Sequence, residues 1–175
     1  MKVLAFAASS SRQSINKQLA TYAASLVEGA QVEVLDLNDF EMPIYSSDRE
    51  NEQGIPAQAQ TFYKKIAEAD AIIVSFAEHN GSYTAAYKNL FDWTSRISQK
   101  VYQDTPMVLL ATSPGPGGAK SVLGSATGSA PFFAMDVKAS MSVPSFYDVF
   151  DSEKGELTDE TLKQQLKESV FSLQP

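Results

Sequence analysis

Apolar and polar positions alternate along this chain in blocks that predict strands and helices in turn. The apolar runs that predict strands cover residues 2–8, 31–37, 71–76, 106–112 and 136–143. Segments with helical spacing or a helix-capping pattern cover residues 15–28, 57–69, 82–98, 119–133 and 158–173. Strands that alternate with helices in this way form βαβ units. The sequence therefore predicts an α/β fold: a doubly wound, five-stranded parallel sheet with helices on both faces.

One strand and one connection stand out from this pattern. The run Ala71-Ile72-Ile73-Val74-Ser75-Phe76 is almost continuously apolar, as expected for a central parallel strand that is buried on both faces. The stretch from Asn38 to Pro56 is polar and contains Pro43 and Gly54, so it predicts a long loop.

Composition restricts the class of protein. The chain has 175 residues, 43 % of them apolar, which predicts one domain over residues 1–175. It has no cysteine, so disulfides, zinc–thiolate sites and thiol nucleophiles are excluded. A formal net charge of −7 argues against nucleic acid as a partner. No apolar run reaches membrane-spanning length and no signal-peptide pattern is present, so we expect a cytoplasmic protein that does not insert into a membrane.

Hydroxyl groups are concentrated where the first strand meets the first helix. The run there reads Ser9-Ser10-Ser11-Arg12-Gln13-Ser14-Ile15-Asn16. A helix N-terminus has unpaired backbone N–H groups and a positive dipole end, so hydroxyls and an arginine at this place predict a phosphate site. The alternative is that the serines only cap the helix, for which one serine would suffice.

Two further loops leave the same edge of the predicted sheet. Ligands of open α/β sheets bind beyond the carboxyl ends of the strands, which selects residues 9–16, 77–83 and 113–118. In the second loop, Asn80-Gly81 predicts a tight turn with positive φ where backbone can approach a flat ligand, and Ser82 is expected to cap the next helix. The third loop has three glycines and two prolines, which suits a wall against a planar ring.

Other chemistries are less well supported. The third loop lacks the Lys-Ser/Thr ending of a P-loop, and no Gly-x-Gly-x-x-Gly follows the first strand. His79 is the only histidine, but no Gly-x-Ser-x-Gly elbow accompanies it, which disfavours a Ser-His-Asp hydrolase. Glu78 and His79 have no second ligand cluster, so no metal site is predicted.

Three motifs together carry a family resemblance. The first is Ser9-x-Ser11-x-x-Ser14-Ile15-Asn16-x-x-Leu19, and the third is Ser113-Pro114-Gly115-x-Gly117-Gly118. The second is Glu78-His79-Asn80-Gly81-Ser82-Tyr83-x-Ala85-x-x-Lys88-Asn89-x-x-Asp92-Trp93. With the tail Phe150-Asp151-x-x-x-Gly155-x-Leu157-Thr158-Asp159, the chain resembles the NAD(P)H-dependent FMN reductases over nearly its whole length. These are flavodoxin-like flavoproteins that include quinone, azo-dye and metal-oxyanion reductases.

The resemblance implies FMN as the cofactor and assigns residues to it. The phosphate end would be bound by Ser9, Ser11, Arg12, Ser14, Ile15 and Asn16. The ring and ribityl chain would be bound by Ala77, Glu78, His79, Asn80, Gly81, Ser82, Ser113, Pro114, Gly115, Gly117 and Gly118. Three details differ from the commonest family pattern: Ala8 stands before Ser9 instead of glycine, Arg12 is one residue closer to Ser14, and His79 replaces tyrosine.

The resemblance also implies an activity and an assembly. NAD(P)H as co-substrate would reduce the flavin, and a small acceptor such as free flavin, a quinone or an azo compound would then be reduced, with no catalytic side chain. A homodimer or homotetramer is implied, with the aromatic residues around Tyr83, Tyr87 and Trp93 as candidate contacts; packing in the core is the other reading of their helical spacing. Two alternatives stay open: a flavodoxin-type electron carrier, and a non-catalytic protein that has lost FMN.

Overall fold

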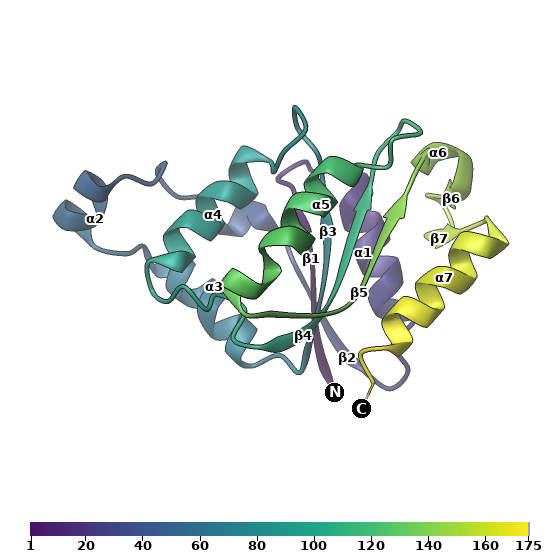
Figure 1. The fold of residues 1–175 in the computed structure, drawn as a ribbon, viewed down its shortest axis with the longest axis horizontal. Helices are drawn as coiled ribbons and strands as arrows, with labels where there is room; N and C mark the ends of the chain where they lie inside the picture. Colours follow the sequence, from purple (N-terminus) through teal and green to yellow (C-terminus); the bar gives the residue numbers. More distant parts are fainter. Residues whose placement is uncertain (175) are drawn as a thin grey trace.

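A parallel sheet of five strands runs through the middle of the molecule (Figure 1). The computed structural model describes residues 1–174. The strands are β1 (Lys2–Ala8), β2 (Gln31–Leu35), β3 (Ala71–Phe76), β4 (Thr105–Thr112) and β5 (Met135–Val143). Their order is β2-β1-β3-β4-β5 and every neighbouring pair is parallel. This is the flavodoxin-like order of a doubly wound sheet, so the predicted fold class is confirmed.

Helices cover both faces of the sheet because the side chains of each strand alternate between two apolar clusters. In β1, Leu4 and Phe6 pack with α3 (Ala57–Ala67), α4 (Ala85–Ser95) and α5 (Lys120–Ser129). Val3 and Ala5 pack with α1 (Ile15–Ser25) and α7 (Glu160–Phe171) on the opposite face. Among the described residues, no helix has the length and apolar character needed to cross a membrane.

The segment Asn38–Pro56 is not the long loop that its composition predicts. It begins within a 3₁₀ helix over Leu37–Phe40 and contains α2 (Ser47–Gln53). Ser46 caps α2 through its side chain, and Gly54 ends it with a φ of 75°. No residue of α2 is buried, so this short helix has no apolar stripe that a periodicity analysis could detect.

Residues 41–54 form an arm that stands away from the sheet, at the left of Figure 1. Asn89 of α4 accepts from the Tyr45 N–H at 2.9 Å and donates to the carbonyls of Met42 and Pro43, both at 3.1 Å. The Trp93 indole also donates to the Pro43 carbonyl, at 2.7 Å. The arm is held by these polar contacts with α4 and by apolar packing, since Met42 is buried in the main apolar cluster and the ring centroids of Tyr45 and Trp93 are 4.9 Å apart.

Three short elements after β5 also escape the sequence pattern. They are α6 (Phe146–Val149), β6 (Phe150–Asp151) and β7 (Glu156–Leu157), the last two paired antiparallel. Elements of two to four residues contain too few positions to show a period. The longer helices and strands lie within a few residues of their predicted bounds.

The aromatic residues of α4 belong to the core. Tyr87 and Trp93 are each 1 % exposed, and the Tyr87 and Tyr102 hydroxyls are 2.7 Å apart. Burial raises the pKa of Tyr87 well above its ordinary value. The prediction that Tyr87 and Trp93 contact another subunit is therefore wrong, because both side chains are already covered by their own chain.

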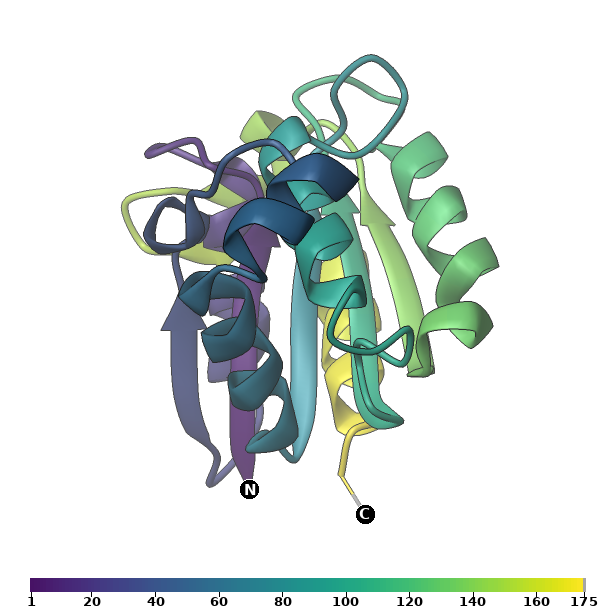
Figure 2. The same cartoon turned by 90° about the vertical axis from the view of Figure 1, so that its left-hand side faces the viewer.

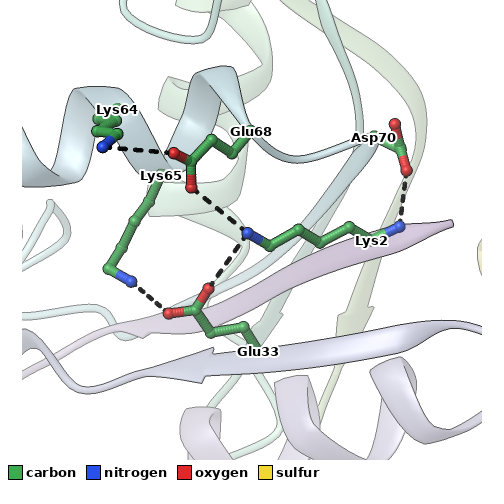
Figure 3. A network of polar contacts seen from close by, with 6 residues as sticks. All are labelled: Lys2, Glu33, Lys64, Lys65, Glu68 and Asp70. Carbon is green, nitrogen blue, oxygen red and sulfur yellow. Dashed lines mark hydrogen bonds and ion pairs between the residues drawn. The ribbon is translucent and has the colours of Figure 1, made fainter.

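At the edge of the sheet where both termini lie, charged side chains join β1, β2 and α3 (Figures 1 and 3). The Lys2 ammonium lies 3.5 Å from Glu68 and 3.9 Å from Glu33, and Lys65 also pairs with Glu33. The Lys2 N–H donates to Asp70 at 2.7 Å. Exposed ion pairs of this kind contribute little individually, so the network supports an edge that the apolar clusters already hold.

Asn89→Ala tests the attachment of the arm. It removes three hydrogen bonds, each with a net worth of about 0.5–1.5 kcal/mol, and should expose residues 41–54 to limited proteolysis. Lys88→Ala is the matched control, because Lys88 lies next to it on α4 but only pairs with Asp92 at the surface. Equal cleavage of the arm in both variants would show that Asn89 does not hold it.

Candidate functional site

The loops that follow β1, β3 and β4 meet at the edge of the sheet opposite the termini (Figures 1 and 2). Between them lies a cleft of about 230 Å³. Its walls are Ser9, Ser11, Gln13, Ser14, Ile15, Asn16, Ala77, Glu78, His79, Thr112, Ser113, Pro114 and Tyr147. Parts of all three loops selected from the sequence are thus brought into one site, with Asn80, Gly81, Ser82, Gly115, Gly117 and Gly118 outside its lining.

The serines of the first loop have different structural roles. Ser14 caps α1, since its hydroxyl accepts from the Lys17 N–H at 3.1 Å, and Ser9 accepts from the Ser11 N–H at 3.2 Å. Within residues 1–174, the backbone N–H groups of Ile15 and Asn16 have no protein acceptor, and the first turn of α1 has no acidic residue. The turn is therefore capped and still offers donors to an anion.

Arg12 lies outside this cleft. It lines an adjoining groove of about 440 Å³ between α1 and the β6–β7 hairpin, together with Lys17, Tyr22 and Phe150. Gln13 and Ser14 line both cavities, so the groove begins where the cleft ends. The structure does not bring the Arg12 side chain into the lining shared by the three loops.

The second loop is a miniature hairpin. The backbones of His79 and Ser82 exchange two hydrogen bonds of 3.0 and 3.1 Å. Asn80 and Gly81 between them have φ values of 52° and 75°, so the predicted tight turn with positive φ is confirmed. The turn places Asn80 and Gly81 at an exposed tip.

Ser82 does not cap the helix that follows. Thr84 does, because its hydroxyl accepts from the Tyr87 N–H at 3.2 Å. The same hydroxyl donates to the Ala8 carbonyl at 2.9 Å, which joins the start of α4 to the end of β1. Ser82 lies two residues before the cap position, because α4 begins at Ala85 and not at residue 82 as expected.

Glu78 connects the second loop to the third. Its carboxylate accepts from the Val122 N–H at 3.0 Å, in the first turn of α5. The residue before α5, Ala119, has a left-handed backbone (φ 56°) and no side chain that could cap the helix. Glu78 therefore supplies from another loop the acceptor that the N-terminus of α5 lacks, and its charge suits the helix dipole.

The third loop is fixed against β5 and α6. A Cβ at Gly118 would lie 2.2 Å from the Ser142 hydroxyl and 3.2 Å from the Pro144 backbone, and its φ is +60°. Only glycine fits there. A Cβ at Gly115 or Gly117 would meet nothing within 4 Å, so that part of the loop presents bare backbone.

Asn16 lines the cleft but is only 2 % exposed. Its side-chain oxygen accepts from the Ser75 hydroxyl at 2.7 Å and from the Thr112 N–H at 3.0 Å. Its amide nitrogen donates to the Thr112 carbonyl at 3.2 Å. One side chain thus joins the start of α1 to the ends of β3 and β4.

Sequence reasoning missed Gln13, Thr112 and Tyr147 as lining residues. Tyr147 is 68 % exposed, on the short helix α6. It lies shortly after the carboxyl end of β5, so the rule that selected the other loops, applied to the fifth strand, would have included it.

An ion pair supports the first loop from outside the cleft. Asp36 accepts from the Lys17 ammonium and from the Asn38 N–H, both at 2.9 Å, and Asn38 donates to the Ser10 carbonyl at 3.0 Å. The hydrogen bond from Lys17, followed by those from Asn38, lowers the pKa of Asp36 to about 2.

Comparison with known proteins gives a family match. Residues 1–147 match the family described as NADPH-dependent FMN reductase. An NADPH:quinone oxidoreductase of Arabidopsis thaliana is 33 % identical over 152 residues, which cover 85 % of this chain and 75 % of the plant protein. An NAD(P)H:quinone oxidoreductase of Solanum tuberosum is 29 % identical over 190 residues, covering 99 % of this chain and 91 % of that protein.

Solved structures share the fold. The flavoenzyme NAD(P)H:(acceptor) oxidoreductase FerB from Paracoccus denitrificans superposes with a TM-score of 0.77 at 24 % identity, covering 98 % of this chain and 94 % of FerB.

Glu78 variants test the cap on α5. Glu78→Ala should cost about 0.5–2 kcal/mol of unfolding free energy and speed hydrogen exchange of the Val122 amide, whereas Glu78→Gln keeps an acceptor and should lose less. Urea denaturation gives the unfolding free energy, and NMR gives the exchange rate of the Val122 amide. If the Val122 amide exchanges in both variants at the wild-type rate, Glu78 does not cap α5.

The Asp36 pair predicts an acid-dependent contribution to stability. Because its folded-state pKa lies below the ordinary value of 3.8, the pair stabilises the protein above about pH 4, and this contribution fades as the pH falls through about 2. Asp36→Asn should be less stable than wild type at neutral pH and should lose less stability than wild type between these pH values. The effect will be small, because both side chains are over one-third exposed. Melting temperatures of wild type and Asp36→Asn are measured at several pH values. If the difference between the two proteins stays constant between pH 4 and 2, the assignment is contradicted.

Proposed function

The chain belongs to the NADPH-dependent FMN reductase family, and we propose that it uses bound FMN to transfer electrons from NAD(P)H to a small acceptor, in particular a quinone. The quinone is proposed because similar proteins carry that substrate class in their names. We further propose that residues 1–175 act as one FMN-binding domain and that the protein is cytoplasmic.

One observation carries the proposal. The first loop of the site offers hydrogen-bond donors, whereas the second and third loops offer backbone with little side-chain bulk. Ser11 and Ser14 line the cleft together with Ile15 and Asn16, whose backbone N–H groups have no acceptor within residues 1–174. Such a set fits a phosphate, since oriented N–H donors at a helix N-terminus favour an anion. The donors act locally, against a protein whose net charge is −7.

The second and third loops suit a planar ring. Ala77 and Pro114 line the cleft, and Gly115 and Gly117, just outside its lining, add backbone without side-chain bulk. The hairpin at Asn80 and Gly81, three residues after Ala77 in the same loop, has an exposed tip. We propose that these two loops hold the ring and ribityl chain, and that Tyr147 limits access to it from α6.

The residues of this chain position ligands and do not themselves react. Hydride uptake from NAD(P)H and electron delivery to the acceptor are the chemistry that FMN supplies when bound. The loops would orient the donor and acceptor in turn at one exposed face, and no side chain is proposed as a general acid or base. NAD(P)H is therefore proposed as a co-substrate rather than a resident ligand.

A homodimer or homotetramer remains part of the proposal. The buried Tyr87 and Trp93 are not available for it, whereas Ile44 on the arm is 76 % exposed. Exposed apolar residues of this kind are the ones that an interface would cover.

Flavin titration tests the proposal. Apoprotein should bind FMN much more tightly than riboflavin, which lacks the phosphate. Ser11→Ala should weaken FMN by roughly 1.5–3 kcal/mol and leave riboflavin unchanged. Ser11 is the cleanest position, because its hydroxyl makes no hydrogen bond within residues 1–174. Ser125→Ala, an exposed serine on α5, is the control.

Turnover separates the function from its alternatives. The FMN-loaded protein should oxidise NADPH rapidly when a quinone is present. If the protein binds FMN but does not oxidise NADPH, it is an electron carrier. If it binds FMN and riboflavin with equal affinity, the proposed phosphate site is wrong.

A further inference from the structure

The resemblance to FMN reductases assigns Asn16 to the flavin phosphate, but the side chain is already engaged. Its oxygen accepts two hydrogen bonds and its nitrogen donates one, at 2.7, 3.0 and 3.2 Å. A side-chain amide offers two acceptor positions and two donors. Three of these four are therefore used within residues 1–174, including both positions on the oxygen.

The partners of Asn16 lie deep in the sheet. Ser75, on β3, is 0 % exposed and faces the same side of the sheet as α1. Thr112 is the last residue of β4 and 1 % exposed. Within residues 1–174 no backbone hydrogen bond joins α1 to β3 or β4, and the Asn16 amide makes a polar contact from the helix to both strand ends.

The chemistry of the contact requires an amide. Thr112 presents an N–H and a carbonyl, which need an acceptor and a donor on one group. An aspartate would lack the donor, and an alanine would leave the Thr112 N–H and the Ser75 hydroxyl without their partner. Buried polar groups that lose a partner incur their full desolvation cost.

We propose that the Asn16 side chain is a positioning group, which holds the first, second and third loops of the cleft in register, and that its main role is not to contact phosphate, which the backbone N–H of the same residue would do. The second loop begins two residues after Ser75, and the third begins immediately after Thr112. Loss of the amide therefore releases the roots of both ring-side loops as well as the start of α1. This inference rests on the proposed function, because its main readout is flavin binding.

The two roles predict different dependence on the phosphate. A residue that contacts only phosphate affects FMN and leaves riboflavin unchanged, as expected for Ser11. A residue that positions all three loops weakens both flavins by a similar factor.

The experiment compares Asn16→Ala and Ser75→Ala by flavin fluorescence titration with FMN and with riboflavin. Asn16→Ala should weaken both flavins about tenfold or more, the equivalent of about one lost hydrogen bond. Ser75→Ala removes one of the three contacts from a residue that cannot touch the ligand, so it should weaken both by a smaller, equal factor. Thr94→Ala is the control, because it removes a buried 2.7 Å hydrogen bond within α4, far from the cleft; it should leave both affinities unchanged.

Two results would overturn the proposal. One is an Asn16→Ala variant that loses affinity for FMN alone, and the other is a Ser75→Ala variant with unchanged affinity for both flavins. If Asn16→Ala does not fold, the comparison of Ser75→Ala with Thr94→Ala decides.

Hydrogen exchange separates this proposal from the proposed function. In the apoprotein the Thr112 amide should exchange slowly, and Ser75→Ala should speed it several-fold while Thr94→Ala does not. If wild-type protein binds neither flavin, the proposed function fails, and a Thr112 amide that is unprotected or indifferent to Ser75→Ala would overturn the positioning role as well.

Discussion

The carboxyl edge of a parallel sheet imposes the constraint on which this site depends. Strands pair along their length, but the loops that leave their ends have no ladder to hold them. In this chain buried or half-buried side chains make the connections: Asn16 joins α1 to β3 and β4, Thr84 joins α4 to β1, and Glu78 joins the second loop to α5. Gly118 lets the third loop pack closely against β5. The shape of the cleft is therefore held by contacts within the chain itself.

The proposed phosphate site needs no cluster of basic side chains, although the chain is acidic. Backbone N–H groups of Ile15 and Asn16 carry no net charge and would attract a phosphate through the helix dipole. Arg12 lies in the adjoining groove, and the nearby Lys17 is paired with Asp36. In the proposed function, local dipoles rather than the overall field of the protein would therefore be the main attraction for the phosphate.

The sequence was sufficient for the sheet, the main helices and the three loops, because long apolar runs and strand-to-loop boundaries are local signals. It failed where the determining contacts are distant in sequence. α2 has no buried residue, so its own residues carry no periodic signal, and the segment that leads into it is bound at Met42 and Pro43 by Asn89 and Trp93 of another helix. The burial of Tyr87 and Trp93 depends on the way α4 packs, and the engagement of Asn16 depends on Ser75 and Thr112, 59 and 96 residues away. A motif can assign a residue to a site, but it does not show which of the polar atoms of that residue are already hydrogen-bonded within the protein.

The most direct test of this account is a map of backbone amide shifts in isotope-labelled apoprotein as FMN is added. The account predicts the largest shifts at the amides of Ile15 and Asn16, with further shifts in residues 77–82 and 113–118. The Arg12 amide should shift no more than the amides next to it in the chain. It also predicts that the Thr112 amide stays protected throughout, because its acceptor is Asn16 in the free protein and in the complex. Shifts confined to the groove between α1 and the β6–β7 hairpin, or none at the start of α1, would contradict it.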